Sequence, residues 1–359
     1  MKAAKSRTWN LMIAATAFKS LRQIILLGDP TQLQPTVTST TRNEFSAAQK
    51  STFISRALTY IDSTHLVTQH WMTPAIAYPV SWLFYDSQLQ NAVGLQIPEA
   101  FGRLMRRFNS EFFFKGSKTP EQTDEVLFVD VPSSKSWKDA DGDSRINVPE
   151  AKCVVAITKA LFSADRRVIK KRTMAIISMY KSQAILNRKL LIAAVGPLAG
   201  SVEVIDISTV DWFQGKENQI VLLSLVHHGN DEIEQRMSRH LLDSHRLCVA
   251  ISRARYGFIV VGNFIGLKMA TDKKRAGNLI RRDFPIHHLL LHYERQGQIF
   301  HYGRDDFPDD SQQRVNADFE HNLHISIEDA RRRKDAEEVR FGKRSADGPS
   351  DQLTKRNRL

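Results

Sequence analysis

The chain has 359 residues, of which 42% are hydrophobic and 25% charged, so it is long enough for two domains with buried cores. Its apolar runs, such as residues 24–27 and 220–226, are far shorter than the roughly 20 residues that cross a bilayer, so neither a transmembrane helix nor a membrane partner is expected. The formal net charge of +12 instead favours a polyanionic partner, because basic side chains that neutralise phosphates release condensed counterions.

The first predicted element in chain order is a buried strand at residues 24–27, which leads into the polar turn GDPTQLQP at 28–35. Residues 45–89 have a helical pattern with interruptions. The irregular stretch 91–123 is interpreted as a linker. Its three phenylalanines at 112–114, beside basic residues, have two interpretations, a buried core or an aromatic surface on which bases stack.

A second α/β unit follows the linker. Its predicted strands cover residues 126–131, 174–178, 202–207, 220–226 and 258–261. Helix-length segments, such as 150–162 and 182–194, separate them. Strands that alternate with helices in this way form a parallel sheet covered on both faces, with ligands at the carboxyl ends of the strands. The sequence therefore predicts an α/β fold.

The last part of the chain becomes helical and then highly charged. Asp283 and Pro285 predict a helix start, and Gly297 predicts its end. From about residue 305 aliphatic residues are scarce, so we expect a basic, disordered tail. Its basic clusters at 343–344 and 355–358 are spaced like a bipartite nuclear-import signal. A merely solvated tail explains them equally well, so the prediction is a nuclear or cytoplasmic protein.

Four motifs occur in a fixed order along the chain. They are GDPTQLQP (28–35), QHWMTP (69–74), STVDWFQGKE (208–217) and RLCVAISRARYGFIVVGN (246–263). Together they resemble motifs III, IIIa, V and VI of superfamily 1 helicases, specifically the group of the nonsense-mediated-decay helicase, senataxin and Aquarius. The resemblance covers roughly residues 3–270.

This resemblance implies a RecA-like parallel sheet of the P-loop NTPase type, related to the AAA proteins. On that basis, four segments are expected. They are the trailing part of a first RecA-like domain with a linker (1–124), a complete second RecA-like domain (125–270), a helical extension (271–304) and the tail (305–359).

The first two motifs imply roles at a nucleotide. Gln32 stands where the family has a glutamine that senses the γ-phosphate of ATP, and Asp29 and Gln69 are assigned to nucleotide binding. The second motif also departs from the family, which usually has Tyr and Arg where this chain has His70 and Trp71. A tryptophan does not supply the charge of an arginine, so even a complete relative with this motif is expected to hydrolyse ATP poorly.

The third motif implies contacts to two ligands. By the resemblance, Gly215 and Glu217 lie near the ribose and phosphates of the nucleotide. Thr209 and Asp211 contact the bound nucleic-acid strand. Tyr180 also resembles part of the family's motif IV, but this match is weak on its own.

The fourth motif contains the arginines of the predicted site. We expect Arg246, Arg253 and Arg255 on one helix, with Arg246 and Arg253 on the same face because they are seven residues apart. By the resemblance, Arg253 is the candidate arginine finger, a cation that stabilises the transferring phosphoryl group. Arg246 is assigned to nucleotide binding.

Two essential parts of a helicase motor are missing from the sequence. It contains no P-loop, GxxxxGK followed by Ser or Thr, because its Gly-Lys pairs at 215–216 and 342–343 are followed by Glu and Arg. No Asp or Glu precedes Asp29, so the acidic pair that positions magnesium is also absent. Residues 3–5, AAK, resemble the segment that comes after this acidic pair in the family, which suggests a shortened gene product.

Metal ligands are also sparse. His288 and His292 have the spacing of two ligands on a helix, but no suitable third ligand stands nearby, so no metal site is predicted.

The resulting expectation is the C-terminal part of an ATP-dependent RNA or DNA helicase. It would bind a single strand and complete an ATP site, but it would not hydrolyse ATP alone. The intact family motor uses ATP and Mg; the cofactor of this chain alone, and whether it is an enzyme, stay open. The alternatives are a non-catalytic nucleic-acid-binding or scaffold protein derived from a helicase, and a protein-interaction module built on the tail.

Overall fold

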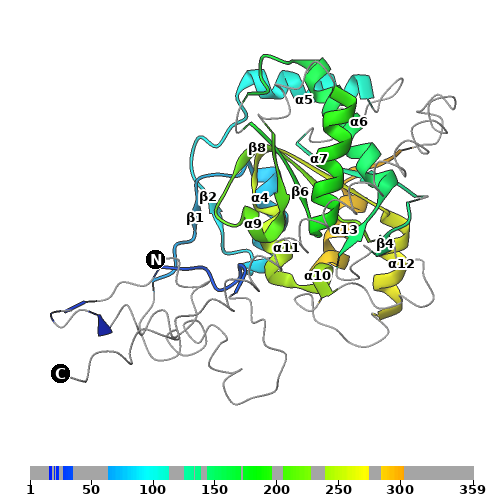
Figure 1. Cartoon of the computed structure of the whole chain (residues 1–359). Helices are drawn as coiled ribbons and strands as arrows, with labels where there is room; N and C mark the ends of the chain where they lie inside the picture. The colour runs from blue at the N-terminus through cyan, green and yellow to red at the C-terminus, as the bar shows by residue number, and fades with distance from the viewer. Residues whose placement is uncertain are drawn as a thin grey trace, which may run out of the picture. The chain divides into compact units, whose positions relative to one another are not determined.

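The computed structural model describes twelve stretches of the chain (Figure 1). They are residues 16–17, 20, 22–23, 27–34, 64–112, 125–132, 134–138, 144–170, 173–195, 205–227, 239–274 and 284–302. The chain divides into two compact units, 1–302 and 303–359, and only the first contains described residues. The predicted strand residues 24–26, Phe113 and Phe114, and the basic clusters of the tail therefore lie outside the described residues.

A parallel six-stranded sheet forms the centre of the first unit, as the sequence predicted. In the order β10-β3-β9-β8-β6-β7, its strands are Ile299–His301, Val126–Asp130, Ala254–Gly262, Asn218–Ser224, Met174–Ser178 and Asp206–Thr209. Every residue of β3 and β6 is buried. That burial is typical of parallel strands covered on both faces.

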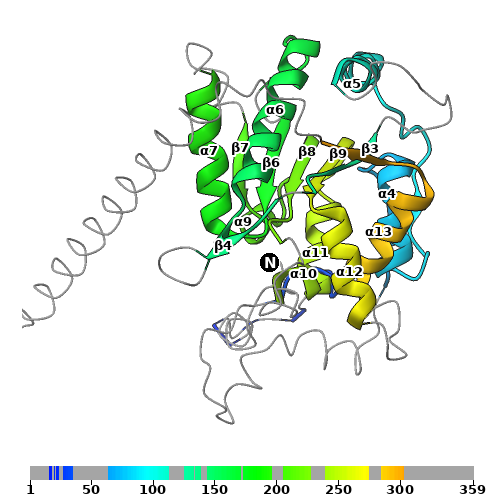
Figure 2. The ribbon, with the colours of Figure 1, turned by 90° about the vertical axis from the view of Figure 1, so that its right-hand side faces the viewer.

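Two helical layers cover the sheet, and alternate residues of each strand face opposite layers. In β3, Val126 and Phe128 belong to one hydrophobic cluster, whereas Leu127 and Val129 belong to the other. The first cluster includes helices α4 (Pro74–Phe84), α11 (Ser244–Ile251), α12 (Phe264–Lys274) and α13 (Pro285–Arg295). The second includes α5 (Glu99–Phe112), α6 (Val148–Ala164) and α7 (Lys181–Val195). Figure 2 shows α6 and α7 on one side of the sheet and α11, α12 and α13 on the other.

Short elements complete the described fold. They are two paired strands β1 (Thr68–Gln69) and β2 (Gln90–Asn91), a hairpin of β4 (Trp137–Lys138) and β5 (Arg145–Ile146), and the one-turn helices α9 (Val210–Phe213) and α10 (Arg239–Leu242). Within the described stretches, no helix combines the length and apolar character that crossing a membrane requires.

Two sequence predictions about local structure are wrong. Residues 91–123 were interpreted as an irregular linker, but Glu99–Phe112 forms helix α5, which buries Leu104, Met105 and Phe108 against the sheet.

The second wrong prediction concerns the arginines of the fourth motif. Helix α11 ends at Ile251, so Arg253 and Arg255 do not share a helix with Arg246. Strand β9 begins at Ala254, and the Ser252 hydroxyl donates to Cys248 O at 2.7 Å, a backbone contact that competes with continuation of a helix. The carbonyls of Arg253 and Arg255 accept hydrogen bonds from Asn218 N and Thr73 N instead, so this stretch belongs to the sheet.

The edge strand β10 was not predicted either. Residues 299–301 lie in a segment that we expected to be helical, but they pair with β3 from Phe128 to Asp130. Helix α13, which precedes it, starts at Pro285 as expected, and Gly297 after its end has a φ of 62°, a conformation that favours glycine.

A buried polar cluster joins α6, α7 and β8. Asn147 caps α6 by accepting a hydrogen bond from Glu150 N. The Glu150 carboxylate accepts hydrogen bonds from Asn147 Nδ2, Ser224 Oγ and Val226 N. These contacts hold Val226 at a φ of 72°, which is strained for a β-branched residue. Burial raises the pKa of Glu150 to about 8, against the lowering effect of the Val226 and Ser224 hydrogen bonds.

Candidate functional site

A cavity of about 860 Å³ lies where several separate segments of the chain meet. We call it the first pocket. Its walls include residues 27–32, residues 64–72, the end of α4 with the turn after it, and residues 244–253 near α11. It brings together Asp29, Gln32, Gln69, Glu217 and Arg253, which come from all four motifs and were each predicted to lie at the nucleotide.

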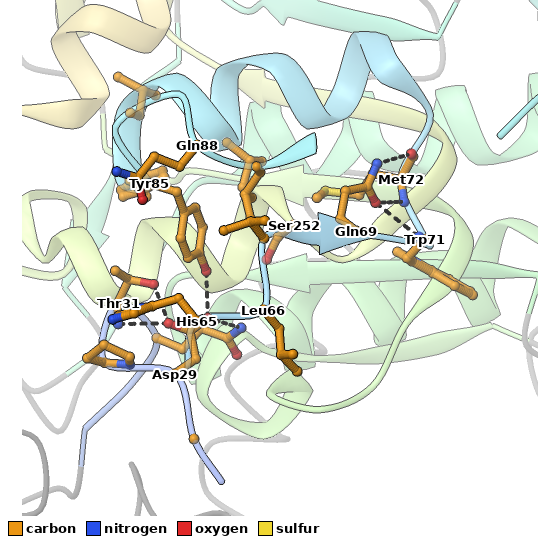
Figure 3. Close-up of a pocket in the computed structure, with 18 of the residues that line it drawn as sticks. Asp29, Thr31, His65, Leu66, Gln69, Trp71, Met72, Tyr85, Gln88 and Ser252 are labelled. Carbon is orange, nitrogen blue, oxygen red and sulfur yellow. Dashed lines mark hydrogen bonds between the residues drawn. The ribbon is translucent and has the colours of Figure 1, made fainter. Parts of the chain in front are cut away.

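Asp29 organises the loop at the base of this pocket. Its carboxylate accepts four hydrogen bonds, from Thr31 N at 3.0 Å, Thr31 Oγ1 at 2.5 Å, Gln32 Nε2 at 2.9 Å and the Tyr85 hydroxyl at 2.6 Å. In Figure 3 the Tyr85 ring points from the end of α4 towards Asp29. The carboxylate therefore fixes the orientation of the Gln32 amide before any ligand binds.

The same loop is anchored to the second half of the chain. His245 Nδ1 of α11 lies 3.1 Å from Thr31 O, and Gln214 Nε2 donates to Leu33 O at 3.3 Å. Leu33 itself is only 6% exposed. These contacts explain why a loop from the first motif lies beside residues of the third and fourth motifs.

Tyr85 connects the loop to α11. Its hydroxyl lies 3.6 Å from Cys248 Sγ as well as bonding to Asp29. Burial, together with the neighbouring Cys248 and Asp29, raises the pKa of Tyr85 far above its ordinary value. Burial likewise raises the pKa of the Cys248 thiol to about 12. Both groups are therefore protonated at neutral pH, and the phenol acts as a donor to Asp29.

Arg253 lines the first pocket together with Gln32, and 5% of its surface is exposed. Its guanidinium donates to Val249 O at 2.9 Å, to Ser252 Oγ at 2.7 Å and to Lys216 O at 3.5 Å. Burial is the main cause that lowers the pKa of Arg253, but an arginine remains a cation at physiological pH. Three of its five N–H groups donate to described residues, and the other two have no partner within the described stretches.

Gln69 lines the first pocket, but its polar atoms serve the chain itself. Its Oε1 accepts from Trp71 N and Met72 N, both at 2.9 Å. Its Nε2 donates to Met72 O at 2.8 Å and to Asn91 Oδ1 at 2.6 Å. Figure 3 shows the bonds from Gln69 to Trp71 and Met72. This side chain therefore holds the turn that presents Trp71, and its nucleotide-binding assignment stays a prediction.

Trp71 has a cationic neighbour that was not predicted from the sequence. Arg255 Cζ lies 4.8 Å from the centroid of the Trp71 ring and 4.9 Å from that of Tyr256. A guanidinium at this distance over an aromatic face is an attractive cation–π arrangement. The contact was missed because Arg255 was placed on a helix, whereas the strand directs it towards Trp71.

Of the three remaining residues predicted at the nucleotide, the structure places one in the first pocket and two outside its lining. Glu217 lines the first pocket, but Gly215 and Arg246 do not. Gly215 has a φ of 83°, a left-handed conformation that explains the need for glycine at this turn. Arg246 pairs with Asp211 at 3.0 Å and with Asp243 at 3.6 Å, and its side chain is 16% exposed.

Thr209 and Asp211, the predicted contacts to nucleic acid, line a separate cavity of about 570 Å³. We call it the second pocket. It lies at the carboxyl ends of β6 and β7, which is where parallel sheets bind ligands. Other lining residues are Tyr180, Lys181, Ile185, Arg188, Ser208 and Trp212. Of these residues, only Tyr180 was considered individually from the sequence. The others were missed because the sequence does not show that these segments lie close together in the fold.

The described residues contain no cluster of three or more His, Cys, Asp or Glu side chains that could hold a metal ion. His288 and His292, which have the spacing of metal ligands, pack instead against the Trp82 ring at centroid distances of 6.0 Å and 6.4 Å. Their role in the described fold is therefore packing between α13 and α4.

Comparisons with known proteins identify the family of the chain. A family model described as an AAA domain matches residues 48–264. The Regulator of nonsense transcripts 1 homolog of Drosophila melanogaster is 30% identical over 246 residues, which are 67% of this chain and 19% of that protein. The ATP-dependent helicase NAM7 of Saccharomyces cerevisiae is 27% identical over 289 residues, covering 78% of this chain and 25% of the relative.

Helicase SEN1 of Saccharomyces cerevisiae is 28% identical over 248 residues, which are 67% of this chain and 10% of the relative. The chain thus spans a quarter or less of the length of these curated relatives. The matched domain, the parallel α/β sheet and these relatives together show that the chain belongs to the AAA-domain family, as a relative of the superfamily 1 nonsense-decay and senataxin-like helicases.

Proposed function

We propose that this chain is the C-terminal part of an ATP-dependent RNA or DNA helicase motor, which binds single-stranded nucleic acid and contributes one wall of an ATP site. The observation that best supports this proposal is that Gln32 and Arg253, from the first and the last of the four motifs, line one cavity of about 860 Å³. A volume of this order suits a nucleotide-sized ligand.

The side chains of the first pocket fit the terminal phosphate of ATP but not the whole molecule. Arg253 offers a buried cation, and Gln32 offers an amide already oriented by Asp29. ATP hydrolysis additionally requires a P-loop to hold the phosphates and an acidic pair to hold magnesium. The sequence contains no P-loop, and no Asp or Glu precedes Asp29, so we propose that protein outside this sequence supplies both parts. We therefore propose that the chain does not hydrolyse ATP alone.

A second candidate function, a non-catalytic nucleic-acid-binding protein derived from a helicase, is favoured by the second motif. Trp71 stands where the related helicases have an arginine, and Arg255 is engaged with its ring. The Gln69 amide is also saturated by the chain. A protein of this kind would bind a single strand without any effect of ATP on that binding.

An ATPase and nucleotide-binding experiment tests the first proposal. We expect no ATP turnover above that of the Arg253→Gln variant, with or without single-stranded RNA. We expect a fluorescent ATP analogue to bind weakly to the wild type and more weakly to Arg253→Gln, with Arg167→Gln as an exposed control. Robust turnover that Arg253→Gln abolishes would show that the chain is a complete ATPase. Equal analogue binding by all three proteins would favour the non-catalytic candidate.

A further inference from the structure

Trp212 is the most exposed tryptophan side chain among the described residues, and it stands at the second pocket. It is 78% exposed, although Val210 and Phe213 beside it in α9 are fully buried. The one-turn helix is therefore anchored by its apolar neighbours while the indole projects outwards. An exposed indole is costly in water and is typical of surfaces that bind a planar or apolar ligand.

The interior of the second pocket is mainly apolar, and the Ser208 hydroxyl is among its few polar groups. The Tyr180 ring packs edge-on against His240 with centroids 5.0 Å apart, and Ile185 on α7 is 45% exposed. The Ser208 hydroxyl oxygen is buried and has no hydrogen-bond partner among the described residues. A buried polar atom without a partner is unfavourable unless a ligand or water satisfies it.

The surroundings of the second pocket favour an anion. Lys181 and Arg188 on α7 line it, and neither forms an ion pair with any residue that the structure describes. The Arg188 guanidinium donates one hydrogen bond from Nη2 to Ile207 O at 2.9 Å, which holds the guanidinium beside the end of β7. The carboxylate that lines the pocket, Asp211, is paired with Arg246 at 3.0 Å. Within the described part of the chain, no carboxylate therefore pairs with either of the two α7 cations.

An aromatic ring, an apolar slot and two cations at one opening match the chemistry of an unstacked base with its flanking phosphates. We propose that the second pocket holds one base of a single-stranded nucleic acid, stacked on Trp212, with Lys181 and Arg188 at the adjacent phosphates and the Ser208 hydroxyl at a base edge. This proposal rests on the proposed function, since it assumes that the chain binds a single strand. It adds the residues that distinguish base binding from mere attraction to phosphate charge.

The test compares strands with and without a base. Fluorescence anisotropy measures the binding of a labelled oligouridine and of an abasic strand with the same number of phosphates. We expect the wild type to prefer the oligouridine and Trp212→Ala to lose that preference, with affinity for oligouridine reduced about 5- to 100-fold. Trp212→Phe should retain most of the affinity, because it restores a stacking ring. Trp137→Ala, which alters another half-exposed tryptophan outside the pocket, should leave both affinities unchanged.

Salt titrations distinguish the contribution of the Trp212 ring to binding from the contribution of the cations on α7. Trp212→Ala should leave the slope of log affinity against log salt unchanged, whereas Lys181→Gln should reduce it by about 0.7, the contribution of one phosphate contact on a single strand. Thermal melts of all variants exclude unfolding as the cause of a loss.

Two failures are distinguishable in this design. A wild type that binds neither strand contradicts the proposed function. A wild type that binds both strands equally, or a Trp212→Ala variant that keeps the preference for bases, leaves the proposed function intact and refutes the base pocket. Preference for an aromatic peptide over both strands would likewise refute it.

Discussion

In the first pocket the polar side chains bind one another, whereas the second pocket presents groups that the described part of the chain leaves unsatisfied. Asp29 alone accepts four hydrogen bonds, and Gln69 uses all of its amide atoms. At the second pocket, the Ser208 hydroxyl has no partner and Trp212 is exposed. The first pocket is thus shaped largely by hydrogen bonds between its own side chains, whereas the polar and aromatic groups of the second pocket are available to a ligand.

The largest effect is expected at the centre of the first pocket. Asp29→Ala removes the acceptor of four hydrogen bonds and leaves several donors unpaired, so it should reduce the free energy of unfolding by about 3 kcal/mol. Urea denaturation measures this loss. Asp206→Ala, which breaks a surface pair with Lys216, should cost less than about 1 kcal/mol. If the two variants were equally stable, the first pocket would not be held by Asp29.

The second expected effect is a pH dependence of stability that originates at Glu150. Its pKa in the folded chain, about 8, lies above its ordinary value of 4.5, so between these values the folded chain binds more protons than the unfolded chain. Stability should therefore fall as the pH rises from about 5 to 8, with a slope on the order of 1 kcal/mol per pH unit.

Denaturation midpoints across that pH range test the Glu150 effect. Glu150→Gln has no proton to lose there, so its stability should change less with pH. Glu99→Gln, at an exposed position of α5, should reproduce the wild-type profile. Identical profiles for the wild type and Glu150→Gln would show that another group causes the dependence.

The smallest effect is expected at the ion pair in the wall of the second pocket. Arg246 of α11 neutralises Asp211 in the wall of the second pocket. Arg246→Gln removes a positive charge that faces the Asp211 carboxylate beside the proposed phosphates, so single-strand affinity should fall about 3- to 10-fold at low salt. The loss should shrink as salt rises, and Asp211→Asn in the same chain should restore affinity. A loss that persists at high salt would point to a change of shape instead of charge.

The sequence was sufficient for the regular parts of the fold. Strands β3 and β6 and helices α6 and α7 were predicted within a few residues, because fully buried parallel strands appear as aliphatic runs and Asn147 marks a helix start. Arg253 and Arg255 were misplaced because the apolar residues before them continue at helical spacing. Hydrogen bonds from distant strands, rather than local pattern, end that helix.

The candidate site was predictable only in part. The motifs identified Gln32, Asp29, Glu217 and Arg253 as neighbours of one ligand, and all four line the first pocket. Tyr85 was missed, since its hydroxyl reaches Asp29 across 56 residues of chain. The properties of Trp212 depend on which neighbours bury the rest of α9, so exposure at that position was not visible in the sequence.

The stretch that contains Arg253 and Arg255 is tied to two other segments by its backbone. Arg253 O accepts from Asn218 N at 3.1 Å, and Arg255 O accepts from Thr73 N at 3.0 Å. A ligand that displaces Arg253 would therefore also strain its backbone hydrogen bond to Asn218. Because Arg255 is only two residues further on, the displacement would be passed to Thr73 and to the turn that contains Trp71. Binding at Arg253 could in this way change the position of the Trp71 ring, which lines the same pocket.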